Sequence, residues 1–165
     1  MIFEVGETVV YPHHGAATIT KVTTRKIKGV DTRYVKLEMH EGDLVVELPI
    51  DNLEEVGVRD VIDQAGVEAV YEVLRSETVE EPGNWSRRFK ANTEKMGSGD
   101  VLRISEVVRD LWRRDRERGV SAGEKAMLAK ARRNLISELL LALHLSAEET
   151  ESVLDEVLES ALVAA

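Results

Sequence analysis

The 165-residue chain has no cysteine, only 3 prolines, and few aromatic residues, which make up 4% of the sequence. The absence of cysteine excludes disulfide bonds, thiolate zinc sites and cysteine nucleophiles. No apolar run approaches the roughly 20 residues that span a bilayer, and Glu4 and Glu7 lie where a signal peptide would carry positive charge. We therefore expect a cytoplasmic protein with no membrane partner, and the small size favours a binding module.

The sequence also lacks the motifs of the common enzyme classes. It contains no Walker loop, no GxGxxG after a strand, no GxSxG elbow and no HExxH motif. His13 and His14 are adjacent, so in an extended strand their rings point to opposite faces, which argues against a metal site. His40 and His144 are isolated. We predict no catalytic residue, no metal, no cofactor and no small-molecule substrate.

The formal net charge of -9 conceals a strongly basic segment. Residues 82–133 hold 14 Lys/Arg and 7 Asp/Glu, whereas residues 134–165 hold no Lys or Arg and 7 Asp/Glu. Charge blocks are usually solvated surface, but a basic block within an acidic protein indicates a polyanionic partner. The first interpretation is that this partner is nucleic acid. The alternative is a protein-only adaptor, in which the same basic segment binds an acidic protein.

Residues 1–58 consist of short β-rich runs separated by turn residues. Thr, Val, Ile and Tyr recur in them with partial alternation, which is typical of strands. The breaks between runs, predicted over residues 12–15, 28–31, 41–43 and 49–52, have hairpin lengths. The segment therefore predicts a small antiparallel barrel or curled sheet, with strands over residues 8–11, 16–24, 33–39 and 44–48.

From Asp60 onward the apolar spacing becomes helical. A first short helix is predicted to end near Arg75, before a linker. Later helices are predicted from four capping residues, two of them in S-x-x-E capping boxes: Asn84, Asp100, Ser121 and Ser146. The whole chain is thus predicted to be α+β, with a connecting helix and linker over 59–83 and an all-α bundle over 84–165 whose last helix is acidic.

Trp85 lies in the first turn of the second predicted helix, and three cations follow it within five positions: Arg87, Arg88 and Lys90. Its spacing to Phe89 is that of an apolar stripe, so packing into the core explains it at least as well as binding does. The functional interpretation combines a helix N-terminus and cations that favour phosphate with a ring that stacks on a base or enters a groove. Trp112, in mid-helix, is assigned to the core.

Three stretches resemble the actinobacterial CarD/CdnL transcription regulators. They are residues 3–15 (FEVGETVVYPHHG), 84–92 (NWSRRFKAN) and 108–130 (VRDLWRRDRERGVSAGEKAMLAK). The resemblance implies a Tudor-like N-terminal domain, shared with the transcription-repair coupling factor, that binds the lobe of the RNA polymerase β subunit. It further implies a helical domain that binds promoter DNA upstream of the -10 element, and a non-catalytic, nucleoid-associated protein.

The resemblance also implies roles for individual residues. A tryptophan matching Trp85 wedges into the minor groove at the upstream edge of the transcription bubble and prolongs the open complex. The predicted DNA-binding residues are Trp85, Arg87, Arg88, Lys90, Arg114 and Lys125, and the predicted RNA polymerase-binding residues are Arg25, Ile27 and Glu47. Relatives carry Arg in place of Glu47, so we expect either an altered polymerase contact or a compensating basic residue on the β subunit.

The main rival is a sequence-specific regulator that uses the third and fourth helices as a helix-turn-helix. Its recognition helix would begin with the residues Ser121-Ala122-Gly123-Glu124. Base-reading Arg, Asn or Gln is absent from this start, and the Glu124 carboxylate is expected to oppose DNA. The sequence therefore favours the non-specific, polymerase-dependent mode of binding.

Overall fold

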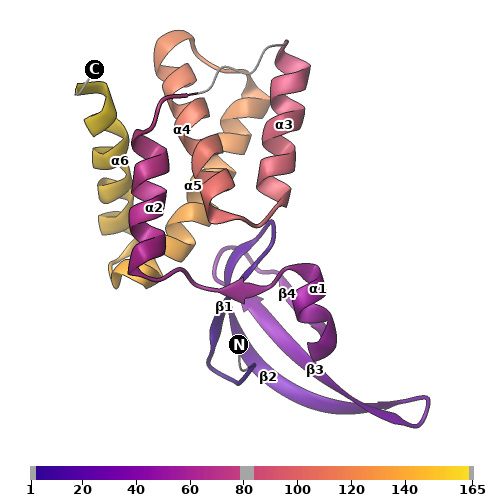
Figure 1. The fold of residues 1–165 in the computed structure, drawn as a ribbon. Coiled ribbons are helices and arrows are strands. Elements are labelled where there is room, and N and C mark those ends of the chain that lie inside the picture. The colour runs from indigo at the N-terminus through magenta and orange to yellow at the C-terminus, as the bar shows by residue number, and fades with distance from the viewer. Residues whose placement is uncertain (1–2, 79–83, 164–165) are drawn as a thin grey trace.

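The computed structural model describes residues 3–78 and 84–163, and it has the predicted α+β organisation of a sheet followed by helices (Figure 1). Five strands form one antiparallel sheet in the order β4-β3-β2-β1-β5. The strands are β1 (Thr8–Tyr11), β2 (Gly15–Ile27), β3 (Val30–Met39), β4 (Val45–Pro49) and β5 (Arg59–Asp60). The four strands expected from the sequence are confirmed.

The β2–β3 hairpin extends beyond the rest of the sheet as an arm (Figure 1). Its turn has only two residues, Lys28 and Gly29, with φ values of 51° and 80°. Positive φ at both turn residues matches the twist of the flanking strands. The break predicted over 28–31 was therefore too long, because Val30 already pairs with Ile27.

A short helical segment that the sequence did not predict packs on the sheet. The turn expected over 49–52 is instead a 3-10 helix, η1 (Ile50–Asn52), followed by a single α-helical turn, α1 (Leu53–Val56). Leu53 is fully buried in the sheet core. Four residues are too few to show a 3.6-residue period, which is why the pattern missed α1.

Five longer helices make up the second half: α2 (Gln64–Arg75), α3 (Trp85–Gly97), α4 (Val101–Arg118), α5 (Ala122–Leu143) and α6 (Ala147–Val163). The predicted caps are confirmed. The side chains of Asn84 and Asp100 accept backbone N–H bonds at 3.1 and 2.8 Å, and Ser121 and Ser146 each form a capping box. No helix in the described part of the chain is long and apolar enough to cross a membrane.

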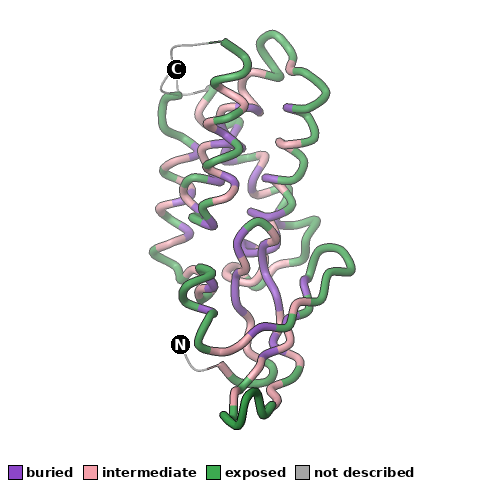
Figure 2. Tube along the Cα trace, turned by 90° about the vertical axis from the view of Figure 1, so that its right-hand side faces the viewer, coloured by how far each residue is buried: buried purple, intermediate pink, exposed green. Residues whose placement is uncertain are grey.

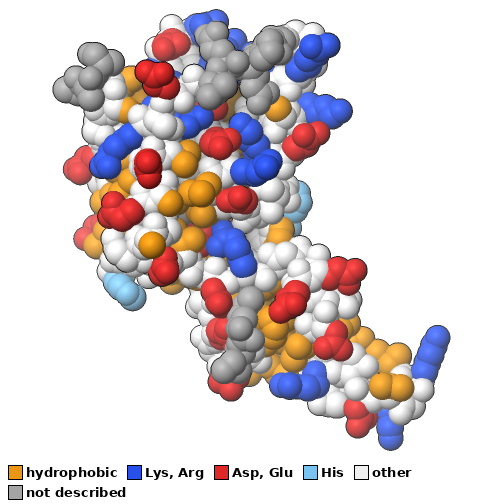
Figure 3. All heavy atoms as spheres, in the orientation of Figure 1, with side chains coloured by type: hydrophobic (Ala, Val, Ile, Leu, Met, Phe, Trp, Pro, Cys, Tyr) orange, Lys and Arg blue, Asp and Glu red, His pale blue; other side chains and the backbone are white. Residues whose placement is uncertain are grey.

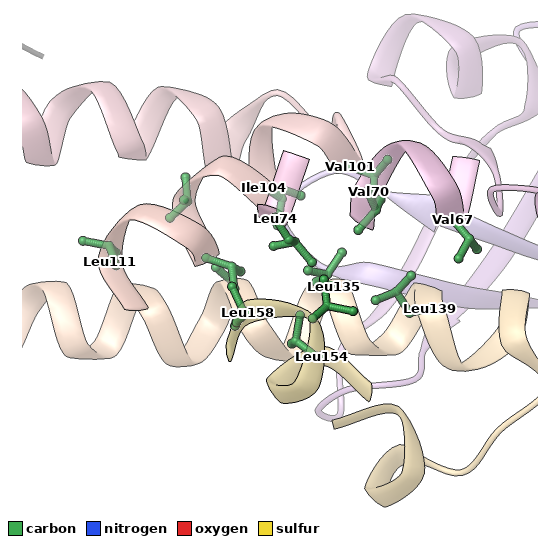
Figure 4. Close-up of a cluster of buried hydrophobic side chains, with 14 of the residues drawn as sticks. Val67, Val70, Leu74, Val101, Ile104, Leu111, Leu135, Leu139, Leu154 and Leu158 are labelled. Carbon is green, nitrogen blue, oxygen red and sulfur yellow. The ribbon is translucent and has the colours of Figure 1, made fainter. Parts of the chain in front are cut away.

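The helical core is built from aliphatic side chains of α2, α4, α5 and α6 (Figure 4). It includes Val67, Val70, Leu74, Ile104, Leu111, Leu135, Leu139, Leu154 and Leu158. Burying each such side chain stabilises the fold by roughly 1.5–3 kcal/mol. Trp112 packs against this cluster while partly exposed, and the Arg116 guanidinium lies 4.6 Å from its ring centroid.

The sheet and the helices meet across a polar interface at the middle of the molecule, where buried segments of both halves come together (Figure 2). Arg59 of β5 donates from Nη1 and Nη2 to the two carboxylate oxygens of Glu138 in α5, at 2.7 and 2.8 Å. Glu138 is only 2% exposed. A bidentate, largely buried pair of this kind fixes orientation as well as distance. The sheet thus reaches two residues beyond the predicted boundary at residue 58.

A second contact brings the backbone of β2 directly against α5. The Ala16 amide donates to Ser137 Oγ at 3.2 Å. A Cβ at Gly15, whose φ is 81°, would lie 2.6 Å from the same oxygen. Only glycine fits this position, because both its backbone conformation and the close approach exclude a side chain. The two halves are therefore packed together and hydrogen-bonded, as well as being joined by the chain.

Candidate nucleic-acid interface

The N-termini of α3 and α5 lie at the end of the helical bundle remote from the sheet (Figure 1). Trp85, the first residue of α3, is hydrogen-bonded to Ser121, the N-cap of α5. Lys and Arg side chains lie at this end of the bundle on the face that Figure 3 shows, among some acidic ones. Two helix N-termini and nearby cations make this end the natural place for an anion such as DNA phosphate.

The indole of Trp85 lies at the surface, with 45% of the residue exposed. It stacks on the Phe89 ring, with centroids 5.0 Å apart and an interplanar angle of 17°. Its Nε1–H donates to Ser121 Oγ at 3.1 Å. The spacing of these aromatics is therefore helical, as predicted, yet Trp85 does not enter the core. The sequence alone had left this alternative open.

Phe89 provides the ring against which the Trp85 indole stacks. It is half-buried and lies near the first turn of α5, where a Cβ at Gly123 would lie 3.5 Å from Phe89 Cε2. This is ordinary van der Waals separation. Phe89 thus lies next to both the Trp85 indole and the first turn of α5, and the indole remains partly exposed.

Glu124, in the first turn of α5, is 1% exposed. Arg88 Nε donates to Glu124 Oε2 at 3.0 Å, and the hydroxyl of Ser121 donates to Oε1 at 3.2 Å. Burial by itself raises the pKa of Glu124, but the hydrogen bonds and charge of Arg88, together with the bonds from Ser121, outweigh burial and lower the pKa below its ordinary value. The expectation that this carboxylate opposes DNA assumed an exposed side chain, whereas the structure buries it in an ion pair with Arg88.

The other cations predicted to bind DNA are differently placed. Arg87, Lys90 and Lys125 are exposed, and Arg114 is half-buried. None of these four has an ion-pair partner among residues 3–78 and 84–163. They come from α3, α4 and α5, so the cationic surface spans three helices. Their role toward DNA stays a prediction.

Several members of the basic segment instead hold helices together. Arg109 donates to Ser76 Oγ and to Asp110, and Arg132 pairs with Asp155 of α6 at 2.9 Å. Arg113 donates to the Leu74 carbonyl. The net charge of the segment therefore overstates the number of cations available to a partner.

The residues predicted to bind RNA polymerase lie on the sheet, far from the Trp85 end. Arg25 of β2 donates to Glu47 of β4 at 3.0 Å, with the two side chains 49% and 41% exposed. The Arg25 guanidinium also lies 4.8 Å from the Tyr34 ring centroid. Ile27 is 43% exposed and Val30, across the hairpin turn, 65%. The structure brings Arg25 and Glu47 together, a contact that the sequence did not suggest.

The adjacent histidines serve the contact between the two halves. The His13 carbonyl accepts from Asn134 Nδ2 at 3.3 Å, and its ring lies against Gly97. His14 is half-buried, and burial followed by the nearby charge of Lys130 lowers its pKa. Within the described residues, no group of three or more His, Asp or Glu side chains could hold a metal ion.

Comparisons with known proteins cover both halves of the chain. The family model "CarD-like/TRCF RID domain" matches residues 3–62, and "CarD, C-terminal domain" matches residues 69–155. The Bacillus subtilis (strain 168) protein named "Putative transcription factor YdeB" is 30% identical over 138 residues, which is 84% of this chain and 90% of that protein.

Among solved structures, the 72-residue N-terminal domain of Myxococcus xanthus CarD, determined by solution NMR, is 28% identical. The match covers 35% of this chain and 77% of that one, with a TM-score of 0.30. The two family models together span the sheet and most of the helical bundle, in the order that the fold shows. The chain therefore belongs to the CarD family of transcription regulators.

Proposed function

We propose that the chain holds the RNA polymerase β subunit with its sheet and promoter DNA with the surface around Trp85, and that the indole stabilises the open complex. Family membership supports the general part of this proposal, that the chain is a transcription regulator that interacts with RNA polymerase. The specific part, that Trp85 stabilises the open complex, depends on one observation, the 45% exposed residue Trp85 at a helix N-terminus. The neighbouring exposed cations Arg87, Lys90 and Lys125 support it.

The mechanism follows from differential affinity. Promoter opening is reversible, so a protein shifts it only by binding the open form better than the closed form. Phosphate contacts from cations are made in both forms and shift nothing. An apolar ring that wedges between unstacked bases is accommodated only by distorted DNA. The proposed role of Trp85 is therefore stabilisation of the melted state, and that of the cations is general affinity.

The test is the lifetime of the open complex on a ribosomal-type promoter, with native protein and with Trp85→Ala. Loss of base stacking worth about 1–3 kcal/mol should shorten the lifetime by roughly 5- to 150-fold. Polymerase binding should be unchanged. Because Trp85 also contacts Phe89 and Ser121, circular dichroism and thermal unfolding must show that the variant is folded. An unchanged lifetime with folded, polymerase-bound Trp85→Ala rejects the proposal.

Lys125→Ala is the matched variant for the cations. It should weaken DNA binding on every sequence alike, because phosphate contacts carry no base information. The slope of log K against log salt should become shallower by about 0.9. A loss confined to particular sequences would favour the helix-turn-helix alternative, and an absence of DNA binding by the native chain with polymerase would favour the protein-only adaptor.

A further inference from the structure

The exposed indole of Trp85 is held in one orientation before any DNA is present. An unrestrained tryptophan on a helix N-terminus would sample several rotamers and lose that freedom on insertion. Here the stacking on Phe89 restricts the tilt of the ring, and the bond from Nε1 to Ser121 Oγ at 3.1 Å restricts its rotation. Both contacts come from groups that are themselves fixed.

Ser121 uses its complete hydrogen-bonding capacity in this arrangement. Its hydroxyl oxygen accepts from the Trp85 indole at 3.1 Å and from the Glu124 amide at 3.2 Å. The hydroxyl proton is donated to Glu124 Oε1 at 3.2 Å. A hydroxyl offers one donor and two acceptor sites, so none is left over. Asp and Asn cap helices as well as Ser does, but an Asp side chain has no proton to donate here.

The contacts close into a circuit. Glu124 is held by Arg88, which lies on α3 only three residues after Trp85. The circuit therefore runs from Trp85 through Ser121 and Glu124 back to Arg88. It joins the start of α3 to the start of α5, two places that are far apart along the chain.

We propose that Ser121, Glu124, Arg88 and Phe89 are positioning residues that pre-organise the Trp85 indole for insertion into opened DNA. The inference rests on the proposed function for its purpose, but the orientation of the indole is a property of the free protein. Preorganisation raises the effective affinity because the ordering is already complete when the partner binds. In this assignment Arg88 acts through Glu124, and its neighbours Arg87 and Lys90 face phosphate.

The first test measures the mobility of the indole in the full chain by time-resolved fluorescence anisotropy, in a Trp112→Phe background that leaves Trp85 as the single tryptophan. Ser121→Ala should increase the fast, local loss of anisotropy and the quenching by acrylamide. Ser121→Thr, which keeps the hydroxyl, should restore both. The matched control is Ser146→Ala, which removes the equivalent capping box from α6, where the hydrogen bonds are local to that helix start. It should leave the indole unchanged.

The second test separates positioning from DNA contact at Arg88. The double variant Arg88→Met with Glu124→Gln removes both charges, so neither is left buried without a partner. It should loosen the indole in the same anisotropy measurement and leave the salt slope of DNA binding unchanged. Lys90→Ala should do the reverse, changing the slope by about 0.9 with no effect on the indole. A slope change for the double variant with an unaltered indole would show that Arg88 contacts phosphate and overturn its assignment.

The link to function is measured as open-complex lifetime with Ser121→Ala. Of the three hydrogen bonds that Ser121→Ala removes, the neutral one to the indole is the one that bears on insertion. Its loss should shorten the lifetime roughly 2- to 10-fold, less than Trp85→Ala does, with rescue by Ser121→Thr. If Trp85→Ala shortens the lifetime and Ser121→Ala does not, the proposed function stands and the positioning inference fails. If Trp85→Ala itself has no effect, the proposed function fails. An indole equally mobile in native protein and Ser121→Ala overturns the positioning inference directly.

Discussion

Each end of the molecule carries an arginine–glutamate pair beside an aromatic ring, but the two pairs are built differently. In the sheet, Arg25 and Glu47 are 49% and 41% exposed, and Arg25 lies over Tyr34. At the far end of the bundle, the side chains of Arg88 and Glu124 are 25% and 2% exposed. Water competes with the first pair much more than with the second. The sheet pair can open for a partner at little cost, whereas the bundle pair is part of the fold.

The largest difference should appear when the arginines are removed. Arg88→Ala leaves Glu124 buried without its counter-charge, which should lower the free energy of unfolding of the helical half by about 3 kcal/mol. Arg25→Ala leaves Glu47 in water and should change stability by less than about 1 kcal/mol. Urea unfolding of the full chain, followed by circular dichroism, measures both. Equal losses would mean that the two pairs do not differ as their burial indicates.

Lowering the pH should weaken the contribution of the Arg88–Glu124 pair to stability, because the pair requires an ionised Glu124 carboxylate. Because the pKa of Glu124 is lowered in the folded state, the folded protein binds fewer protons at this site than the unfolded chain. The stabilisation is complete above the ordinary Glu value of 4.5 and is lost as the pH falls through the lower folded value. Thermal unfolding from pH 7 to pH 3 should therefore show a smaller acid loss in Glu124→Gln. Parallel profiles for the two proteins would contradict this.

A small effect on stability is also expected from Glu47→Arg. It replaces an exposed ion pair by two like charges, a change of less than about 1 kcal/mol. Its effect should fall on the partner instead. Since the family resemblance implies an Arg at this position, we expect tighter binding to RNA polymerase, measured by titration with the polymerase at low and high salt. Weaker binding would indicate that a basic residue on the β subunit already complements Glu47.

Most elements could be predicted from the sequence, because their signals are local. Asn84 and Asp100 lie next to the helices they cap, and the strands alternate within a few residues. The segments that were missed, α1 and β5, have four and two residues, too short for any period. The position of α1 depends on Leu53 entering the sheet core, and that of β5 on its pairing with β1, and both are tertiary effects.

The candidate site divides in the same way. The sequence located Trp85 at a helix start beside cations, and the structure placed its indole in solvent. It could not reveal that Ser121 accepts from the indole, or that Glu124 turns inward, because those partners are 36 residues away from Trp85 and Arg88. The capping box at Ser121 was visible as a helix start, but nothing local indicated its second role.

The bidentate contact between Arg59 and Glu138 bears on how such a regulator would choose its place on DNA. With the sheet and the bundle joined there, the hairpin arm and the start of α3, which carries Trp85, lie at opposite ends of the molecule (Figure 1). If one extremity is anchored on the transcription machinery, the other reaches a single location along the duplex. The position bound on DNA would then be set by its distance from the anchored end of the protein. The base sequence would matter only through how easily the base pairs separate at that position.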